Sequence, residues 1–248
     1  MTRRLALPVI IGLLVLAVPD VAFPQTLSLD MGEGGGSSTA RIIQLILLMT
    51  VLTLAPSMLV MVTSFTRIII VLSFLRTAMG VQQTPPNQVL VSLALFVTMF
   101  IMMPVFEEAY DNGISPLIEE QIDEEAAIER SIAPFKTFMM TYVRERDLAL
   151  FADIAKIPDE EIRNEMPLRV LVPSFMISEL RRAFEIGFLI FIPFLIIDMV
   201  VASVLMSMGM MMLPPVMISL PFKLIFFVLV DGWYLVAGSL VQSYGGGG

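Results

Sequence analysis

The sequence predicts an all-α membrane-associated protein, made of broken hydrophobic helical hairpins and a helical extracytoplasmic segment. The first observation is composition, because 57% of the 248 residues are hydrophobic, 15% are charged and the mean hydropathy is +0.87. Soluble domains are about 45–50% apolar and about 25% charged. The second observation is that four apolar blocks approach or exceed the roughly 20 residues with which a helix crosses a bilayer. Proline recurs in each block, which makes them poor lipid-facing helices.

The chain begins with the pattern of a secretory signal peptide, which we assign to residues 1–24. Arg3 and Arg4 precede an apolar run over residues 5–18, which is too short to span a bilayer and is followed by small residues. An uncleaved N-terminal anchor is the alternative interpretation. Residues 25–40, which contain the stretch MGEGGGSST, are expected to form a flexible linker outside the membrane.

Residues 41–106 are predicted to form the first hydrophobic hairpin. Its apolar blocks are 42–63 and 89–106, and the segment between them has no charged residues except Arg67 and Arg76. Positive residues concentrate on the cytoplasmic side of membrane proteins. This rule places the connecting segment in the cytoplasm, in agreement with the orientation that a cleaved signal peptide sets.

Residues 107–180 are predicted to form an extracytoplasmic acidic and helical domain. Its first part, 107–129, carries acidic residues and no basic one. Its second part repeats aromatic and methionine side chains at helical spacing between Phe135 and Tyr142, which predicts a modestly amphipathic helix. We interpret the charges of this domain as a solvated face rather than as catalytic carboxylates.

Residues 181–248 are predicted to form the second hydrophobic hairpin. Its apolar blocks, 186–208 and 213–240, are joined by the sequence SMGMMMLPPV. Ordinary turns hold polar residues, whereas this break holds methionines between glycine and proline, which interrupt helices and let a loop project. The methionines are Met208, Met210, Met211 and Met212, and the residues expected to shape the loop are Gly209, Pro214 and Pro215.

Three charged residues fall inside the apolar blocks of this second hairpin: Asp198, Lys223 and Asp231. Each would cost about 2.5–3.5 kcal/mol at a lipid-exposed helix centre, so we expect them to be buried against protein. Because four blocks are too few to bury one another, this predicts an oligomer. A buried lysine needs an acidic neighbour, and Glu179 and Asp198 are the candidates that we consider. We take Glu179 and Lys223 as a candidate inter-subunit ion pair.

The composition also excludes several functional classes. The chain has neither cysteine nor histidine, which removes disulfides, thiolate metal sites and the commonest general base. It has no P-loop, no HExxH motif and no Ser-His-Asp set, so we expect neither an enzyme nor a bound cofactor or metal. The formal net charge of −8 argues against a nucleic-acid partner.

Two long stretches together resemble the FliP family, the flagellar type III export-gate proteins, whose injectisome homologues form the SctR group. They are residues 56–105, PSMLVMVTSFTRIIIVLSFLRTAMGVQQTPPNQVLVSLALFVTMFIMMPV, and residues 171–233, LVPSFMISELRRAFEIGFLIFIPFLIIDMVVASVLMSMGMMMLPPVMISLPFKLIFFVLVDGW. The resemblance implies a pore subunit that forms a pentamer-like ring with FliQ and FliR, works with FlhA and FlhB, and is assisted in assembly by FliO. Unfolded export substrates would pass through this pore, in the bacterial inner membrane at the flagellar basal body. The methionine loop would then act as a gasket around the closed pore.

Two other functions remain open from the residues alone. Broken helices with buried charges are also typical of a small secondary transporter or an ion channel subunit. Such a transporter should show sequence repeats, and the two halves show no convincing one. An intramembrane hydrolase is disfavoured because the chain lacks a nucleophile–base pair and a plausible metal site.

Overall fold

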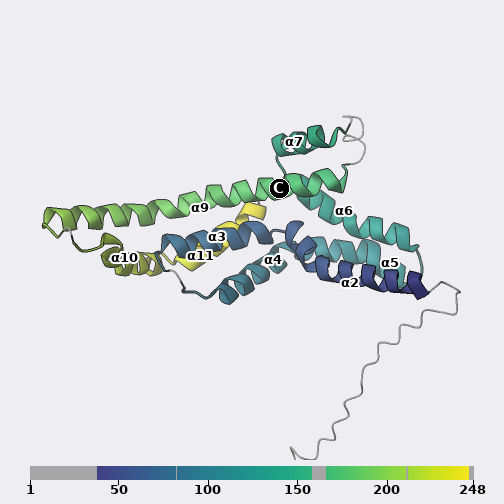
Figure 1. Ribbon diagram of the computed structural model, residues 1–248, viewed down its shortest axis with the longest axis horizontal. Helices are drawn as coiled ribbons and strands as arrows, with labels where there is room; N and C mark the ends of the chain where they lie inside the picture. Colours follow the sequence, from purple (N-terminus) through teal and green to yellow (C-terminus); the bar gives the residue numbers. More distant parts are fainter. Residues whose placement is uncertain (1–37, 82, 158–165, 211, 246–248) are drawn as a thin grey trace, which may run out of the picture. The chain divides into compact units, whose positions relative to one another are not determined.

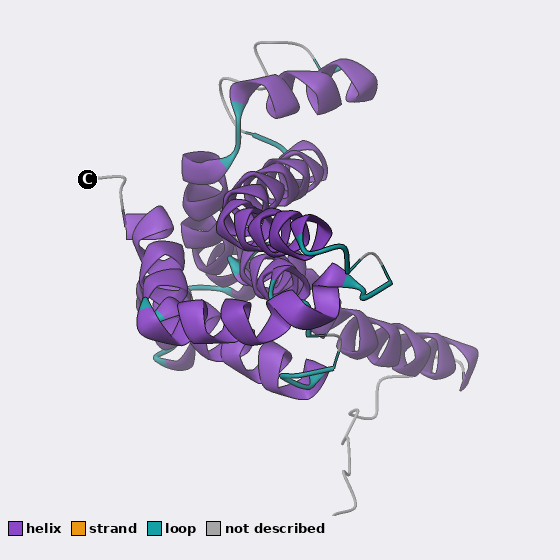
Figure 2. Ribbon diagram, turned by 90° about the vertical axis from the view of Figure 1, so that its left-hand side faces the viewer, coloured by secondary structure: helices purple, strands orange, loops and turns teal. Residues whose placement is uncertain are grey.

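The computed structural model describes residues 38–81, 83–157, 166–210 and 212–245, and the regular elements in these ranges are all helices (Figure 2). The predicted all-α class is therefore confirmed. The predicted signal peptide lies outside the described residues, as does most of the predicted linker. The helices are α2 (Ser38–Met61), α3 (Phe65–Ala78), α4 (Asn87–Ala109), a π-helical turn (Tyr110–Ile114), α5 (Ser115–Ile118), α6 (Glu124–Tyr142), α7 (Glu145–Ala155), α9 (Leu168–Ser207), α10 (Pro215–Leu229) and α11 (Gly232–Gly245), labelled in Figure 1.

Three segments of the described chain are long and apolar enough to cross a membrane: Ile42–Met61, Asn87–Ile118 and Leu168–Ser207. A fourth crossing exists if α10 and α11, which meet at an angle of 62°, form one broken span. Length and hydropathy together identify a membrane protein, as the composition predicts.

The chain divides into two compact units, residues 1–49 and 50–248. The described part of the first unit is the start of α2, where Ile42, Ile43 and Ile46 are exposed. The second unit contains the end of α2 and all the later helices, and it holds the hydrophobic core.

Helix α3 lies in the core of the second unit. Its Ile68, Val71 and Leu72 are buried against residues of three other helices: Leu90 and Ala94 of α4, Ala183 of α9 and Leu240 of α11. The sequence indicates a cytoplasmic connector here, because only its two arginines are charged. The structure places the run FTRIIIVLSFLRTA in a helix that the longer helices cover. The side of the membrane on which it lies stays a prediction.

Helix α9 runs without a break for 40 residues and contains two prolines, Pro173 and Pro193. It therefore passes through residue 181, where the sequence placed the start of the second hairpin. Its close approach to α3 depends on Gly187, because a Cβ at this position would lie 2.5 Å from the ring of Phe74. The extended α3–α9 contact makes α9 the support for both hairpins.

Between α10 and α11 the chain bends at Asp231, whose φ of 50° lies in the left-handed region. Gly232 follows, and a Cβ there would meet the ring of Phe227 at 2.1 Å. Asp231 is exposed in this chain. Its burial, which the sequence predicts for an oligomer, stays a prediction.

Candidate functional site: the methionine loop and its charged supports

The loop between α9 and α10 begins with a well-formed helix end. Gly209 has a φ of +76°, its N–H donates to the carbonyl of Met206 at 3.0 Å, and the N–H of Met210 donates to the carbonyl of Leu205 at 3.0 Å. These two bonds make a Schellman motif, in which glycine takes the left-handed position without steric cost. The sequence thus stops α9 by backbone geometry.

The next helix starts at the two prolines. Pro214 precedes α10, Pro215 is its first residue, and the N–H of Met217 donates to the carbonyl of Pro214 at 3.1 Å. Proline suits the first helical position because its missing N–H has no partner there in any helix. Gly209 and the prolines therefore bound a short loop at both ends, as their positions in the sequence predict.

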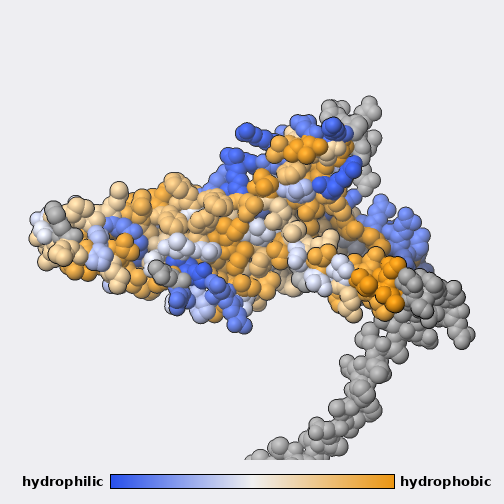
Figure 3. Space-filling model, in the orientation of Figure 1, coloured by the Kyte–Doolittle hydropathy of each residue, from blue (hydrophilic) through white to orange (hydrophobic). Residues whose placement is uncertain are grey.

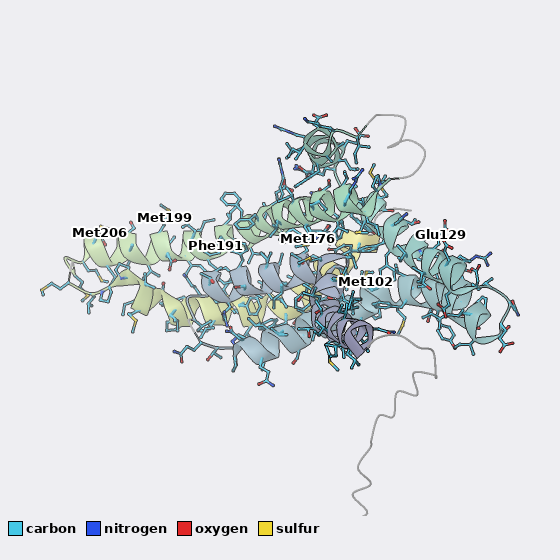
Figure 4. The ribbon with its side chains drawn as sticks, turned by 45° about the vertical axis from the view of Figure 1, so that its right-hand side comes forward. Met102, Glu129, Met176, Phe191, Met199 and Met206 are labelled. Atoms are coloured by element: carbon cyan, nitrogen blue, oxygen red, sulfur yellow. The ribbon has the colours of Figure 1, made fainter. Side chains whose placement is uncertain are left out.

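The methionines of this loop are exposed. The exposed fractions are 56% for Met208, 47% for Met210 and 98% for Met212, while Met211 lies outside the described residues. Figure 4 shows that Met199 and Met206 continue the methionine-bearing surface along the part of α9 that leads to the loop. Thioether side chains have three rotatable bonds and no strong polar group, so this loop offers a soft apolar surface.

A buried charge pair ties the two helices of this hairpin together. Lys223 of α10 donates to Asp198 of α9 at 2.6 Å and to the carbonyl of Ala78, the last residue of α3, at 3.3 Å. Ser219 donates to the other carboxylate oxygen of Asp198. Lys223 is 4% exposed, so the ammonium is held almost entirely by protein groups. The pair thereby connects α9, α10 and the end of α3.

A second buried network lies nearer the start of α9. Arg67 of α3 donates to Glu179 of α9 through Nε at 2.8 Å and also through Nη2. The hydroxyl of Tyr244 donates to the same carboxylate, and its ring lies 3.9 Å from the guanidinium carbon of Arg67. Arg67 Nη1 further donates to the hydroxyl of Ser243 at 3.0 Å. The network joins α3, α9 and α11 around one fully buried carboxylate.

These two networks show which charges pair within one chain. Within the chain Glu179 pairs with Arg67, and Lys223 pairs with Asp198. The pairing of Glu179 with Lys223 between subunits stays a prediction. The nearer acidic candidate, Asp198, is the partner because it faces α10 across the hairpin, with its side chain 32% exposed. The sequence does not single out Arg67 as a site residue, because its positive charge indicates a cytoplasmic connecting segment. Its place inside a strongly apolar run is the signal that points to burial.

The family assignment follows from comparison with known proteins. A model of the FliP family matches residues 48–240, which include the pairs Arg67–Glu179 and Asp198–Lys223 and the methionine loop.

The chain belongs to the FliP family.

Similar FliP proteins are known from several bacteria. The chain is 58% identical over 250 residues to the flagellar biosynthetic protein FliP of Caulobacter vibrioides, covering 99% of this chain and 94% of the relative. It is 57% identical over 202 residues to the protein of the same name from Bacillus subtilis, covering 82% and 91%. The corresponding protein of Pectobacterium carotovorum is 54% identical over 236 residues, covering 94% and 91%. The resemblance seen in the sequence is thus confirmed.

In this FliP chain a third polar cluster fixes α7 to α9. Asp147 of α7 accepts from Ser178 of α9 at 2.6 Å and from two nitrogens of Arg144, both at 2.8 Å. Burial disfavours the charged carboxylate, but these hydrogen bonds outweigh it and hold the pKa of Asp147 below its ordinary value. Asp147 therefore stays ionised at neutral pH.

The aromatic neighbour of the Arg67 network comes from α6. Burial raises the pKa of Tyr142, with a smaller opposing effect from Arg67, so the phenol keeps its proton. Its hydroxyl donates to the backbone carbonyl of Tyr244 in α11. Helix α6 is in this way joined to α11. Among the described residues, no group of three or more acidic side chains is placed to hold a metal ion.

Proposed function

We propose that the chain is a subunit of the flagellar type III protein export gate. It forms a ring with further copies of itself and with FliQ and FliR, and unfolded flagellar proteins leave the cell through the pore of this ring. FlhA and FlhB work with the ring, and FliO assists its assembly. The gate lies in the bacterial inner membrane at the flagellar basal body, with the segment after α4 on the extracytoplasmic side. The name of the relatives, flagellar biosynthetic protein, supports this assignment.

The observation that carries the proposal is the exposed methionine loop at the end of a hairpin that Lys223 and Asp198 hold together. Several copies of such a loop, brought together by a ring, place many thioethers at one narrow point. These side chains close against one another and part around substrates of varied sequence. An apolar constriction also resists ion leakage by dewetting, so a closed gate holds the membrane potential.

A second support is the apolar surface that one chain leaves uncovered. Figure 3 shows mainly apolar colours over α9 and α10, while hydrophilic atoms gather over α7. Phe96 of α4, Phe188 of α9 and Leu229 of α10 are 75%, 69% and 79% exposed. Exposed apolar area of this extent marks an interface with lipid or with protein partners. The proposed role is non-enzymatic, since transport through a ring requires no chemistry on the substrate.

The test replaces Met210, Met211 and Met212 together by alanine in the full complex. Membranes that contain the variant should leak ions, because alanine cannot fill the constriction, while the complex still copurifies with its partners. Met140→Ala, which removes an exposed methionine of α6, is the control and should remain tight. An assembled complex that is tight to ions with the triple substitution contradicts the gasket role.

Transport measurements separate the gate from the transporter alternative. Loss of subunit export and motility on deletion, without solute uptake by the purified protein in vesicles, supports the gate. Solute uptake by the purified protein overturns the proposal in favour of a secondary transporter.

A further inference from the structure

A groove follows α9 and α11 on the surface of the second unit. It begins at a polar cavity of about 340 Å³ between the end of α6, the middle of α9 and the end of α11. A second cavity of about 500 Å³ shares Arg182, Glu185 and Ser243 with the first. A third cavity of about 530 Å³ shares Ser239 with the second and is lined by α11 alone. We call this continuous surface the α9–α11 groove.

The polar end of the groove has more positive than negative charge. Four arginines line it: Arg67, Arg144, Arg181 and Arg182. The first two are neutralised by the buried carboxylates of Glu179 and Asp147. The other two share the single carboxylate of Glu185, at 2.9 Å and 3.2 Å. Three carboxylates therefore pair with four guanidinium groups, which leaves one positive charge at this end.

The two arginines that share Glu185 have donors to spare. Arg181 donates to Glu185 through Nε, and Arg182 donates to it through Nη1. Their side chains are 54% and 62% exposed, so the other N–H groups are open to an acceptor from outside the chain. A carboxylate is the group that matches the fork of a guanidinium with two parallel hydrogen bonds.

The rest of the groove is apolar, and one of its walls is low. Ile186, Leu189 and Ile190 of α9 form the first wall. The second wall is α11, where small side chains line the groove: Ala237, Gly238 and Ser239. A Cβ added at Gly238 would meet nothing within 4 Å, so the backbone there is open to a close neighbour. Small residues of this kind let the backbones of two helices approach closely.

The length of the groove fits a helix. Nine residues separate Arg181 from Ile190 along α9, which is about 13 Å or roughly two and a half helical turns. The hydroxyl groups inside the groove are satisfied by their own helix, since Ser239 and Ser243 each donate to a carbonyl of α11, at 3.0 Å and 2.7 Å. Beyond its charged end the groove therefore suits apolar side chains.

The charge balance decides what such a helix must carry. A helix that covers the groove removes water from Arg181 and Arg182. A purely apolar helix would leave the excess guanidinium buried without a counter-ion, which is strongly unfavourable. A helix with one carboxylate neutralises this charge and supplies the acceptor that the open N–H groups lack. The occupant is therefore apolar over most of its length and has one acidic residue.

A second copy of this chain does not offer such a helix at the right height. Ala183, next to Arg182, belongs to the same buried cluster as Ala94 and Val97 of the exposed apolar helix α4. The first acidic residue of α4, Glu107, lies ten residues beyond Val97, about 15 Å further along the helix. In a ring of copies at one height, α4 of the neighbouring copy thus brings no carboxylate to these arginines.

We propose that the α9–α11 groove binds an apolar helix of a different polypeptide, which places one aspartate or glutamate on Arg181 and Arg182. The apolar side of this helix lies along Ile186, Leu189 and the small residues of α11. Recognition of a helix in a groove combines apolar contacts with charges that fix its register. The choice of a different polypeptide over a second copy rests on the proposed ring, whereas the charge balance and the apolar walls belong to the single chain.

The test places a photo-crosslinking residue in the groove of the full chain in living cells. Ser239, which is exposed, is replaced by p-benzoylphenylalanine, and the crosslinked segment is identified by mass spectrometry. We expect an apolar helix of another polypeptide with an aspartate or glutamate in it. Crosslinks to a second copy of this chain, to a helix without an acidic residue or to lipid overturn the proposal, as does the absence of any crosslink.

Variants of the charged end show whether the arginines hold this helix. Arg181→Gln with Arg182→Gln should lower the crosslinking yield by about fivefold or more, since charge-assisted hydrogen bonds are lost. Arg130→Gln with Arg146→Gln removes the same charge from exposed positions on α6 and α7 and should leave the yield unchanged. Equal losses in the two double variants refute a specific contact.

A third variant changes the yield in the opposite direction, which misfolding cannot imitate. Glu185→Gln removes the carboxylate that competes for both arginines and should raise the crosslinking yield. A lower yield contradicts the proposed geometry. Arg182→Glu should lower the yield, and lysine in place of the acidic residue of the captured helix should restore part of it; no restoration shows that the two groups do not meet.

Motility of the same cells keeps this inference separate from the export function. Cells that are motile but give no crosslink from residue 239 to an acidic apolar helix overturn the groove and leave the proposed function intact. Solute uptake by the purified protein overturns the proposed function, while the response of the crosslink to the arginine variants still decides the groove.

Discussion

Replacing Glu179 by alanine should destabilise the folded chain by about 3–5 kcal/mol, because it leaves a buried guanidinium without its counter-ion. Arg67 is 2% exposed and Glu179 is fully buried, so water cannot replace the lost carboxylate. Two N–H groups of Arg67 and the hydroxyl of Tyr244 lose their acceptor together. For a chain of this length, the melting temperature should fall by roughly 6–20 °C.

A double-mutant cycle tests the physical reason for this loss. Arg67→Met and Glu179→Leu are made singly and together in a Tyr244→Phe background, so that no orphaned hydroxyl adds to the effect. Each single change leaves one buried charge, whereas the double change leaves none. We therefore expect the double variant to be less destabilised than the sum of the single variants by more than about 1 kcal/mol.

The measurement is equilibrium unfolding of the purified protein in mixed micelles, followed by circular dichroism. Additive effects would show that the two charges do not depend on each other. Single variants that each cost less than about 1 kcal/mol would show that water reaches the pair. Either result refutes the assignment of this pair as the buried electrostatic centre of the fold.

Three further predictions concern the other contacts of α9. Lys223→Glu should lower the melting temperature, because it places a second acid opposite Asp198 across the hairpin. Adding Asp198→Lys to the same chain should restore part of the lost melting temperature. No restoration would rule out the Lys223–Asp198 pair. Lowering the pH below about 4, the ordinary aspartate value, should weaken the α7–α9 contact. The reason is that Asp147 has a lower pKa when folded, so its stabilisation is present above that pH and is lost as it becomes protonated. Asp147→Asn should therefore reduce the difference in melting temperature between pH 7 and pH 3, and an unchanged difference contradicts the assignment. Gly187→Ala should lower the stability of the fold by about 1–3 kcal/mol, because the added methyl group overpacks the neighbouring ring of Phe74. Gly238→Ala faces open space and should be neutral or stabilising by up to about 1 kcal/mol. Thermal unfolding of the two variants side by side measures the difference.

The loop at the end of α9 was predictable because its geometry is local. Gly209, Pro214 and Pro215 act through their own backbone preferences, which hold wherever the hairpin packs. The exposure of Met212 likewise follows from its place between two helix-ending signals. Residue type and spacing therefore decide this part of the candidate site.

The charge pairs depend on distance in space, which residue spacing does not provide. Glu179 and Arg67 are 112 residues apart, and they meet because α3 packs along α9. From the sequence this segment is predicted to be a cytoplasmic connection. Two arginines in a short segment are as typical of a cytoplasmic loop as of a buried helix. Asp198 and Lys223 lie closer in the chain, yet only the antiparallel packing of α9 and α10 selects this pair over Glu179.

The sequence by itself determined the helical membrane class, the family and the exposed methionine loop, because composition, long motifs and local backbone preferences do not require a packed structure. Only the tertiary structure decided which charges neutralise one another, that α3 is a core helix, and that the arginines of α9 open onto an apolar groove. The physical reason is that burial, ion pairing and cavities are properties of surfaces brought together from distant parts of the chain.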